Sequence, residues 1–122
     1  MNNNKQVKTD FNIYNKILDY SQYTRANILN SIPSVHRDIK IHLADETFNL
    51  TKLLFYAVYN KGNIRMKYLV EMEVTISTID MLFGILKNIP KVSNKKIESA
   101  LKKLEEVKNI IYAWINNEEK RK

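Results

Sequence analysis

The hydrophobic residues of this chain fall on one or two sides of a helix over four long segments, when residues are placed at 100° intervals. Three short polar or helix-breaking stretches separate the segments: "NSIP" at 30–33, "NKGN" at 60–63 and "NIPKVS" at 88–93. The pattern predicts helices over about 10–30, 33–59, 64–89 and 93–117. Asp10 and Ser93 are expected as N-terminal caps, and Gly62 is expected in the left-handed conformation that ends a helix.

These proportions are typical of an all-α protein. Helices of this length joined by connections of a few residues predict an up-down antiparallel four-helix bundle. The chain has 122 residues with only two glycines and two prolines, which argues against the many tight turns of a β-sandwich. We expect a polar N-terminal tail at 1–9, the bundle at 10–117 and a charged C-terminal tail at 118–122.

The apolar positions of the last three helices predict part of the core. The second helix is expected to bury Val35, Ile39, Leu43, Leu50, Leu53, Leu54 and Ala57. The third helix is expected to bury Leu69, Met72, Ile76, Ile79, Phe83 and Leu86. The fourth helix is expected to bury Ile97, Ala100, Leu101, Leu104, Ile111 and Ile115, with Val107, Ile110 and Trp114 at the edge of this stripe.

The two middle helices each carry a second apolar ridge, which in the second helix lies roughly opposite the first. The ridges are Ile41, Phe48, Phe55 and Tyr59 in one helix and Val70, Val74, Met81 and Ile85 in the other. A monomeric bundle buries one stripe per helix, so a second ridge predicts self-association into a homo-oligomer. Trp114 is assigned to the same interface, where its ring would cover both its own bundle and a neighbouring subunit. A thicker core within one chain is the alternative.

The charge of the chain is +7, and it is concentrated near the C-terminus. Residues 90–122 contain nine basic residues and five acidic ones. This surface is the candidate site for nucleic acid, because phosphate binding is driven by positive charge. Its residues are Lys91, Lys95, Lys96, Lys102, Lys103, Lys108, Lys120, Arg121 and Lys122. The alternative is a solvated helix face with pairs such as Glu98 and Lys102.

The sequence lacks the residue patterns of common catalytic sites. It has no cysteine, and its two histidines, His36 and His42, belong to no Glu-x-x-His motif. Phosphate-binding glycine loops and nucleophile elbows are also missing. We therefore expect a non-enzymatic protein without metal or cofactor. Two charges on apolar helix sectors, Arg25 and Glu71, are expected to form structural ion pairs.

A membrane location is not expected. The longest apolar run, Leu53–Tyr59, is much shorter than the roughly 18 residues needed to span a bilayer. The N-terminal segment has no apolar signal-peptide region, which predicts a cytoplasmic protein.

Three segments resemble a known family: "SIPSVHR" at 31–37, "RMKYLVEMEVTISTIDMLFGIL" at 65–86 and "VSNKKIESALKKLEEVKNIIYAWI" at 92–115. The chain is similar over residues 11–117 to the accessory variability determinant proteins of diversity-generating retroelements. These belong to a wider family of small four-helix bundles that includes proteins encoded in intervening sequences of large-subunit ribosomal RNA genes. The matching positions are Pro33, Arg37, Leu69, Glu71, Met72, Glu73, Val74, Ala113, Trp114 and Ile115.

The resemblance implies a barrel-like homopentamer that binds the reverse transcriptase of the element and its template RNA, or DNA, and supports error-prone copying. One departure affects the expected site: Asp80 and Gly84 stand where the family tends to place arginines on the outer face of the third helix. RNA binding would then use the fourth helix and the tails. An oligomeric scaffold of the ribosomal intervening-sequence type, with no retroelement role, is the second hypothesis, and other adaptor roles stay open.

Overall fold

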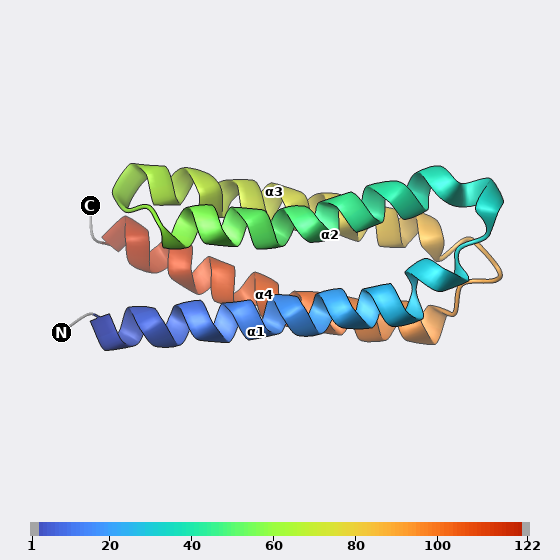
Figure 1. Cartoon of the computed structure of the whole chain (residues 1–122), viewed down its shortest axis with the longest axis horizontal. Helices are drawn as coiled ribbons and strands as arrows, with labels where there is room; N and C mark the ends of the chain where they lie inside the picture. Colours follow the sequence, from blue (N-terminus) through green and yellow to red (C-terminus); the bar gives the residue numbers. More distant parts are fainter. Residues whose placement is uncertain (1–2, 121–122) are drawn as a thin grey trace.

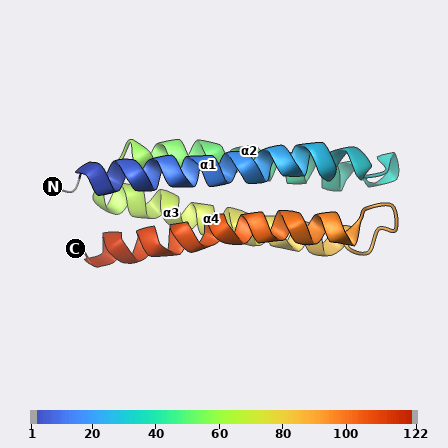
Figure 2. The same cartoon turned by 90° about the horizontal axis from the view of Figure 1, so that it is seen from below.

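The chain folds into four long helices that lie side by side as a bundle, with both termini at the same end (Figures 1 and 2). The structure is a computed structural model that describes the backbone of residues 3–120 and the side chains of residues 12–120. Residues 3–120 contain no strand, so the all-α prediction is confirmed. The helices are α1 (Asn3–Asn27), α2 (Arg37–Val58), α3 (Gly62–Leu86) and α4 (Asn94–Lys120).

Short connections turn the chain between the helices. Two 3₁₀ turns, η1 (Leu29–Ser31) and η2 (Ser34–His36), join α1 to α2. Gly62 has φ +59°, the left-handed value expected from its sequence position, and it begins α3. Ser93 caps α4 as predicted, because its Oγ accepts a hydrogen bond from the backbone N–H of Lys96 at 3.3 Å.

Both expected tails are shorter than predicted. Helix α1 begins at Asn3, so Asp10 lies inside the helix and does not cap it. Helix α4 continues to Lys120, because the buried side of the helix extends to Glu118. The second helix begins later than predicted, since Pro33 has an extended backbone (ψ 150°) and is followed by the η2 turn.

Ion pairs show the relative direction of α3 and α4. Lys87 pairs with Glu98 at 2.8 Å, and Asp80 pairs with Lys108 at 3.9 Å. Residue numbers therefore fall along one helix as they rise along the other, so the two helices are antiparallel. Helices α1 and α4 are related in the same way by the pairs of Lys16 with Glu106 and Asp19 with Lys103.

The buried residues of α4 follow a strict alternation of three and four residues. They are Ile97, Ala100, Leu104, Val107, Ile111, Trp114 and Glu118. Leu101 and Ile115, predicted as core, are only partly buried, whereas Val107 and Trp114, predicted at the edge, are buried. The buried line is displaced because α4 contacts α1 on one side and α3 on the other.

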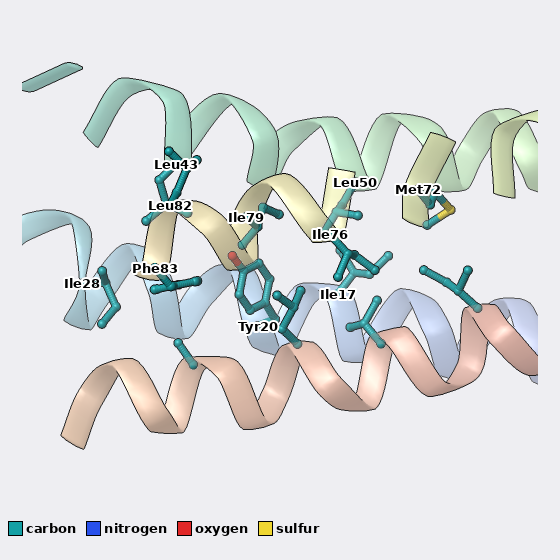
Figure 3. Close-up of a cluster of buried hydrophobic side chains, with 14 of the residues drawn as sticks. Ile17, Tyr20, Ile28, Leu43, Leu50, Met72, Ile76, Ile79, Leu82 and Phe83 are labelled. Atoms are coloured by element: carbon teal, nitrogen blue, oxygen red, sulfur yellow. The ribbon is translucent and has the colours of Figure 1, made fainter. Parts of the chain in front are cut away.

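The residues predicted as the core of the third helix are all buried, and Figure 3 shows most of them facing Ile17, Tyr20, Leu43 and Leu50 of the neighbouring helices. The Tyr20 hydroxyl hydrogen-bonds with Thr47 Oγ1 at 3.2 Å. Burial raises the pKa of Tyr20 to about 12. Helices α1 and α2 are thus linked by a buried polar contact within a mainly apolar core.

Candidate interaction surfaces

Trp114 lies inside its own bundle and not at an interface, which corrects the assignment made from the sequence. Only 3% of the residue is exposed, so it offers almost no surface to a neighbouring subunit. The guanidinium of Arg65 lies over the ring, 5.3 Å from its centroid. The interaction of a cation with an aromatic face stabilises this arrangement. Trp114 therefore closes the core at the end of the bundle that holds the termini.

Arg65 joins three helix ends at this position. Its Nε donates to the carbonyl of Ala57 at 2.8 Å, and its Nη2 donates to the carbonyl of Val58 at 3.3 Å. These acceptors belong to the last turn of α2, where carbonyl groups lack partners within the helix. Nη1 donates to Glu118 Oε1 at 3.0 Å, and both side chains are buried.

This buried pair was not predicted. The sequence indicated Arg25 and Glu71 as buried charges, but both are exposed in the structure. Arg65 lies four residues before buried Leu69, and Glu118 lies four residues after Trp114. The spacing of three and four residues between core positions therefore predicts that both charges lie on buried helix faces.

The eight residues of the two extra apolar ridges are exposed in the single chain. Their exposed fractions are Ile41 48%, Phe48 67%, Phe55 44%, Tyr59 82%, Val70 44%, Val74 61%, Met81 59% and Ile85 40%. Rows of apolar side chains on a solvent-exposed surface are typical of interaction sites. Val35, predicted on the core face of the second helix, is 80% exposed because it lies on the η2 turn.

A groove of about 670 Å³ runs between α1 and α2. Phe48 and Phe55 lie along one wall, and Tyr14 and Leu18 lie along the other. Arg25, Lys52 and several hydroxyl side chains complete the lining. The groove is thus a mainly apolar channel with positive charge on its wall.

The predicted basic residues do not form one surface. Lys103 pairs with Asp19 at 3.0 Å, and Lys108 pairs with Asp80 at 3.9 Å, so both bridge neighbouring helices. The exposed ones are Lys91, Lys95, Lys96, Lys102 and Lys120. Arg121 and Lys122 lie outside the described residues. Glu98 and Glu106 interrupt the outer face of α4, which weakens this face as a phosphate site.

Positive charge gathers instead at the end of the bundle away from the termini, which we call the basic end. The end of α1, the starts of α2 and α4 and the end of α3 meet there (Figure 1). Its exposed basic residues are Arg25, Arg37, Lys40, Lys87, Lys91, Lys95 and Lys96, and its acidic residues are Asp38 and Glu98. This site was not predicted, because its residues come from separate segments, of which only the last was recognised as basic.

Further observations bear on other kinds of site. The described side chains contain no group of three or more His, Cys, Asp and Glu residues placed to hold a metal ion. Among residues 3–120, no helix combines the length and the apolar character needed to cross a bilayer. Comparison of the chain with protein-family models, with curated protein sequences and with solved structures gave no match.

Proposed function

We propose that this protein is a non-enzymatic adaptor that binds RNA through its basic end and self-associates through its apolar ridges. The single observation that supports the RNA-binding role is the basic end, with seven exposed cationic side chains and two acidic ones, of which Lys87 and Glu98 form an ion pair at 2.8 Å. Such a surface attracts phosphate groups and releases counterions from the nucleic acid. Binding is then mainly electrostatic and nearly independent of base sequence.

The proposed assembly is an up-down antiparallel four-helix bundle that forms a closed homo-oligomer, a barrel-like pentamer. The exposed ridges support self-association, because burying a large apolar side chain contributes about 1.5 to 3 kcal/mol. A closed oligomer brings the basic ends of several subunits to one molecule of RNA. Several weak phosphate contacts then act together, which raises the affinity without new types of contact.

Within this proposal, the resemblance to accessory variability determinant proteins supports a specific role. The protein would hold template RNA beside the reverse transcriptase of a diversity-generating retroelement and support mutagenic copying. A scaffold of the ribosomal intervening-sequence type is the second candidate, favoured by Asp80 and Gly84 on the outer part of α3. A reverse transcriptase gene beside the reading frame would support the first role, and its absence there would support the second.

Two triple variants with the same change in charge test the RNA site. Lys91, Lys95 and Lys96 are replaced by Gln at the basic end, and Lys61, Lys102 and Lys120, exposed elsewhere, are replaced by Gln as a control. The measurement is the affinity for a labelled single-stranded RNA at several salt concentrations, followed by fluorescence anisotropy. We expect the slope of log affinity against log salt to fall by about 0.7 for each phosphate group that the protein no longer binds, in the first variant only.

Each other outcome has a definite meaning. Absence of salt-dependent RNA binding by the unmodified protein would contradict the proposed function. A reduced slope in the control triple variant alone would place the RNA on the surface that carries Lys61, Lys102 and Lys120 and would contradict the assignment to the basic end.

A further inference from the structure

The solvent side of α3 repeats the residue spacing of its buried side. Val70, Val74, Ser77, Met81 and Gly84 are separated by four, three, four and three residues, and we call this row the outer seam. The buried row of the same helix follows the same alternation from Arg65 to Leu86. This spacing keeps one line of side chains facing a partner helix. The spacing of the outer seam is therefore typical of a helix that packs against partners on two sides. Within the single chain, α3 is packed on one side only.

The groove between α1 and α2 has the complementary pattern. On α2, Ile41, Ala44, Phe48, Thr51 and Phe55 are spaced by three and four residues. On α1, Tyr14, Leu18, Ser21 and Arg25 continue the same alternation. All of these except Ile41 line the groove. Two walls with helical spacing therefore line the groove, and at one end of it the ring centroids of Tyr14 and Phe55 lie 6.5 Å apart.

We propose that α3 of a second copy of this chain occupies the groove between α1 and α2. This inference rests on the self-association in the proposed function and assigns the two surfaces that meet. The outer seam from Val70 to Gly84 rises through 14 residue steps, or about 21 Å at 1.5 Å per residue, and the groove-lining row from Ala44 to Phe55 rises through 11 steps, or about 16 Å. The groove therefore holds about three turns of the outer seam.

Shape is also complementary at the centre of the two rows. Phe48 lies midway between Ile41 and Phe55, and 67% of it is exposed. Ser77 lies midway between Val70 and Gly84 and borders a hollow that is also lined by Val74, Met81 and Tyr112. A projecting ring on one surface thus faces a hollow on the other, which is knobs-into-holes packing.

Charges of opposite sign lie beside the two surfaces, although exposed Lys67 continues the outer seam three residues before Val70. Arg25 and Lys52 line the groove, whereas Glu71 and Glu73 flank the outer seam. Opposite charges around an apolar contact favour one partner and orientation over others. A second copy supplies this combination of apolar row and flanking carboxylates.

Gly84 fits the same arrangement. It is exposed in the last turns of α3, and an added Cβ would meet no atom within 4 Å in the chain itself. Glycine destabilises a helix relative to alanine, so the single chain gives no packing reason for it. A partner helix that approaches closely at this end of the seam does give one.

The two surfaces are different, so each subunit uses its groove for one neighbour and its outer seam for the other. Such a head-to-tail contact produces a closed ring when the rotation between subunits closes. This property allows a decisive experiment. Phe48→Glu disables the groove and leaves the outer seam intact, and Val74→Glu does the reverse. Val35→Glu, at an 80% exposed apolar position outside both surfaces, is the matched control.

Masses are measured by light scattering after size exclusion, with helicity checked by circular dichroism. We expect an oligomer for the unmodified protein and for Val35→Glu, and the 14.4 kDa monomer for Phe48→Glu and for Val74→Glu alone. An equal mixture of the two monomeric variants should form a one-to-one dimer, since one intact groove then meets one intact seam.

The experiment distinguishes failure of self-association from failure of the proposed contact between α3 and the groove. If the unmodified protein is monomeric, self-association itself is wrong. If it is oligomeric and either Glu variant keeps its full mass, or the mixture stays monomeric, oligomerisation stands and the proposed contact of α3 with the groove is wrong. Should a variant lose helicity, Phe48→Ser and Val74→Ser repeat the test with a milder change.

Discussion

At the scale of single residues, the end of the bundle that holds the termini depends on Arg65. Its guanidinium reaches two carbonyl groups of α2, the carboxylate of Glu118 in α4 and the ring of Trp114. A planar group with several donors in fixed directions makes these contacts together, which a lysine ammonium cannot do. The residue is therefore a structural connection between helix ends and not a surface charge.

The first prediction follows from this burial. Arg65→Met should lower the free energy of unfolding by about 3 kcal/mol, because it removes one partner of a buried ion pair and three hydrogen bonds. Arg37→Met, at an exposed arginine outside the groove, should change it by no more than about 0.5 kcal/mol. Urea denaturation of both variants measures the difference. Similar values for the two would show that Arg65 contributes no more than a surface residue.

At the scale of helices, neighbouring positions of α4 differ strongly in burial. Leu104 is 1% exposed, whereas Leu101 is only partly buried, although the amphipathic pattern placed both in the core stripe. The sequence of α4 alone shows a broad apolar sector. It does not indicate which residues of that sector the two neighbouring helices cover. The contacts with α1 and α3 decide it.

A pair of matched substitutions tests the register of α4. Leu104→Ala should destabilise the bundle by about 3 kcal/mol, through lost apolar burial and a residual cavity. Leu101→Ala should cost about 1 kcal/mol, because part of that side chain is already in water. The comparison uses the same residue type in one helix, so helix propensity cancels. Equal losses of unfolding free energy would mean that the buried face of α4 is displaced toward Leu101.

At the scale of the whole molecule, the two proposed surfaces lie in different places. The basic end lies opposite the termini, whereas the groove and the outer seam run along the sides of the bundle. RNA binding and self-association therefore use largely separate residues, and Arg25 is the one that belongs to both the basic end and the groove. Apart from Arg25, they are coupled through the number of basic ends that one RNA can contact.

This separation predicts a specific effect of monomerisation on RNA binding. Phe48→Glu leaves all seven cationic residues of the basic end in place. Its affinity for a long RNA should nevertheless fall, and the salt slope with it, because one subunit contacts fewer phosphates than an oligomer. A short RNA that covers one basic end should show a much smaller change. Equal slopes for the oligomer and the monomeric variant on the long RNA would indicate that a single subunit forms the complete site.

The sequence by itself determined the helical class, the approximate helix bounds, the Ser93 cap and the exposed second ridges. These features depend on local conformational preference and on periodicity, which are readable along one segment. The tertiary structure alone decided which side of the apolar sector of α4 is buried, that Arg65 meets Glu118, and that basic residues from four segments gather at one end. Those features depend on contacts between residues far apart in the chain, and periodicity within a helix carries no information about which helix lies beside it.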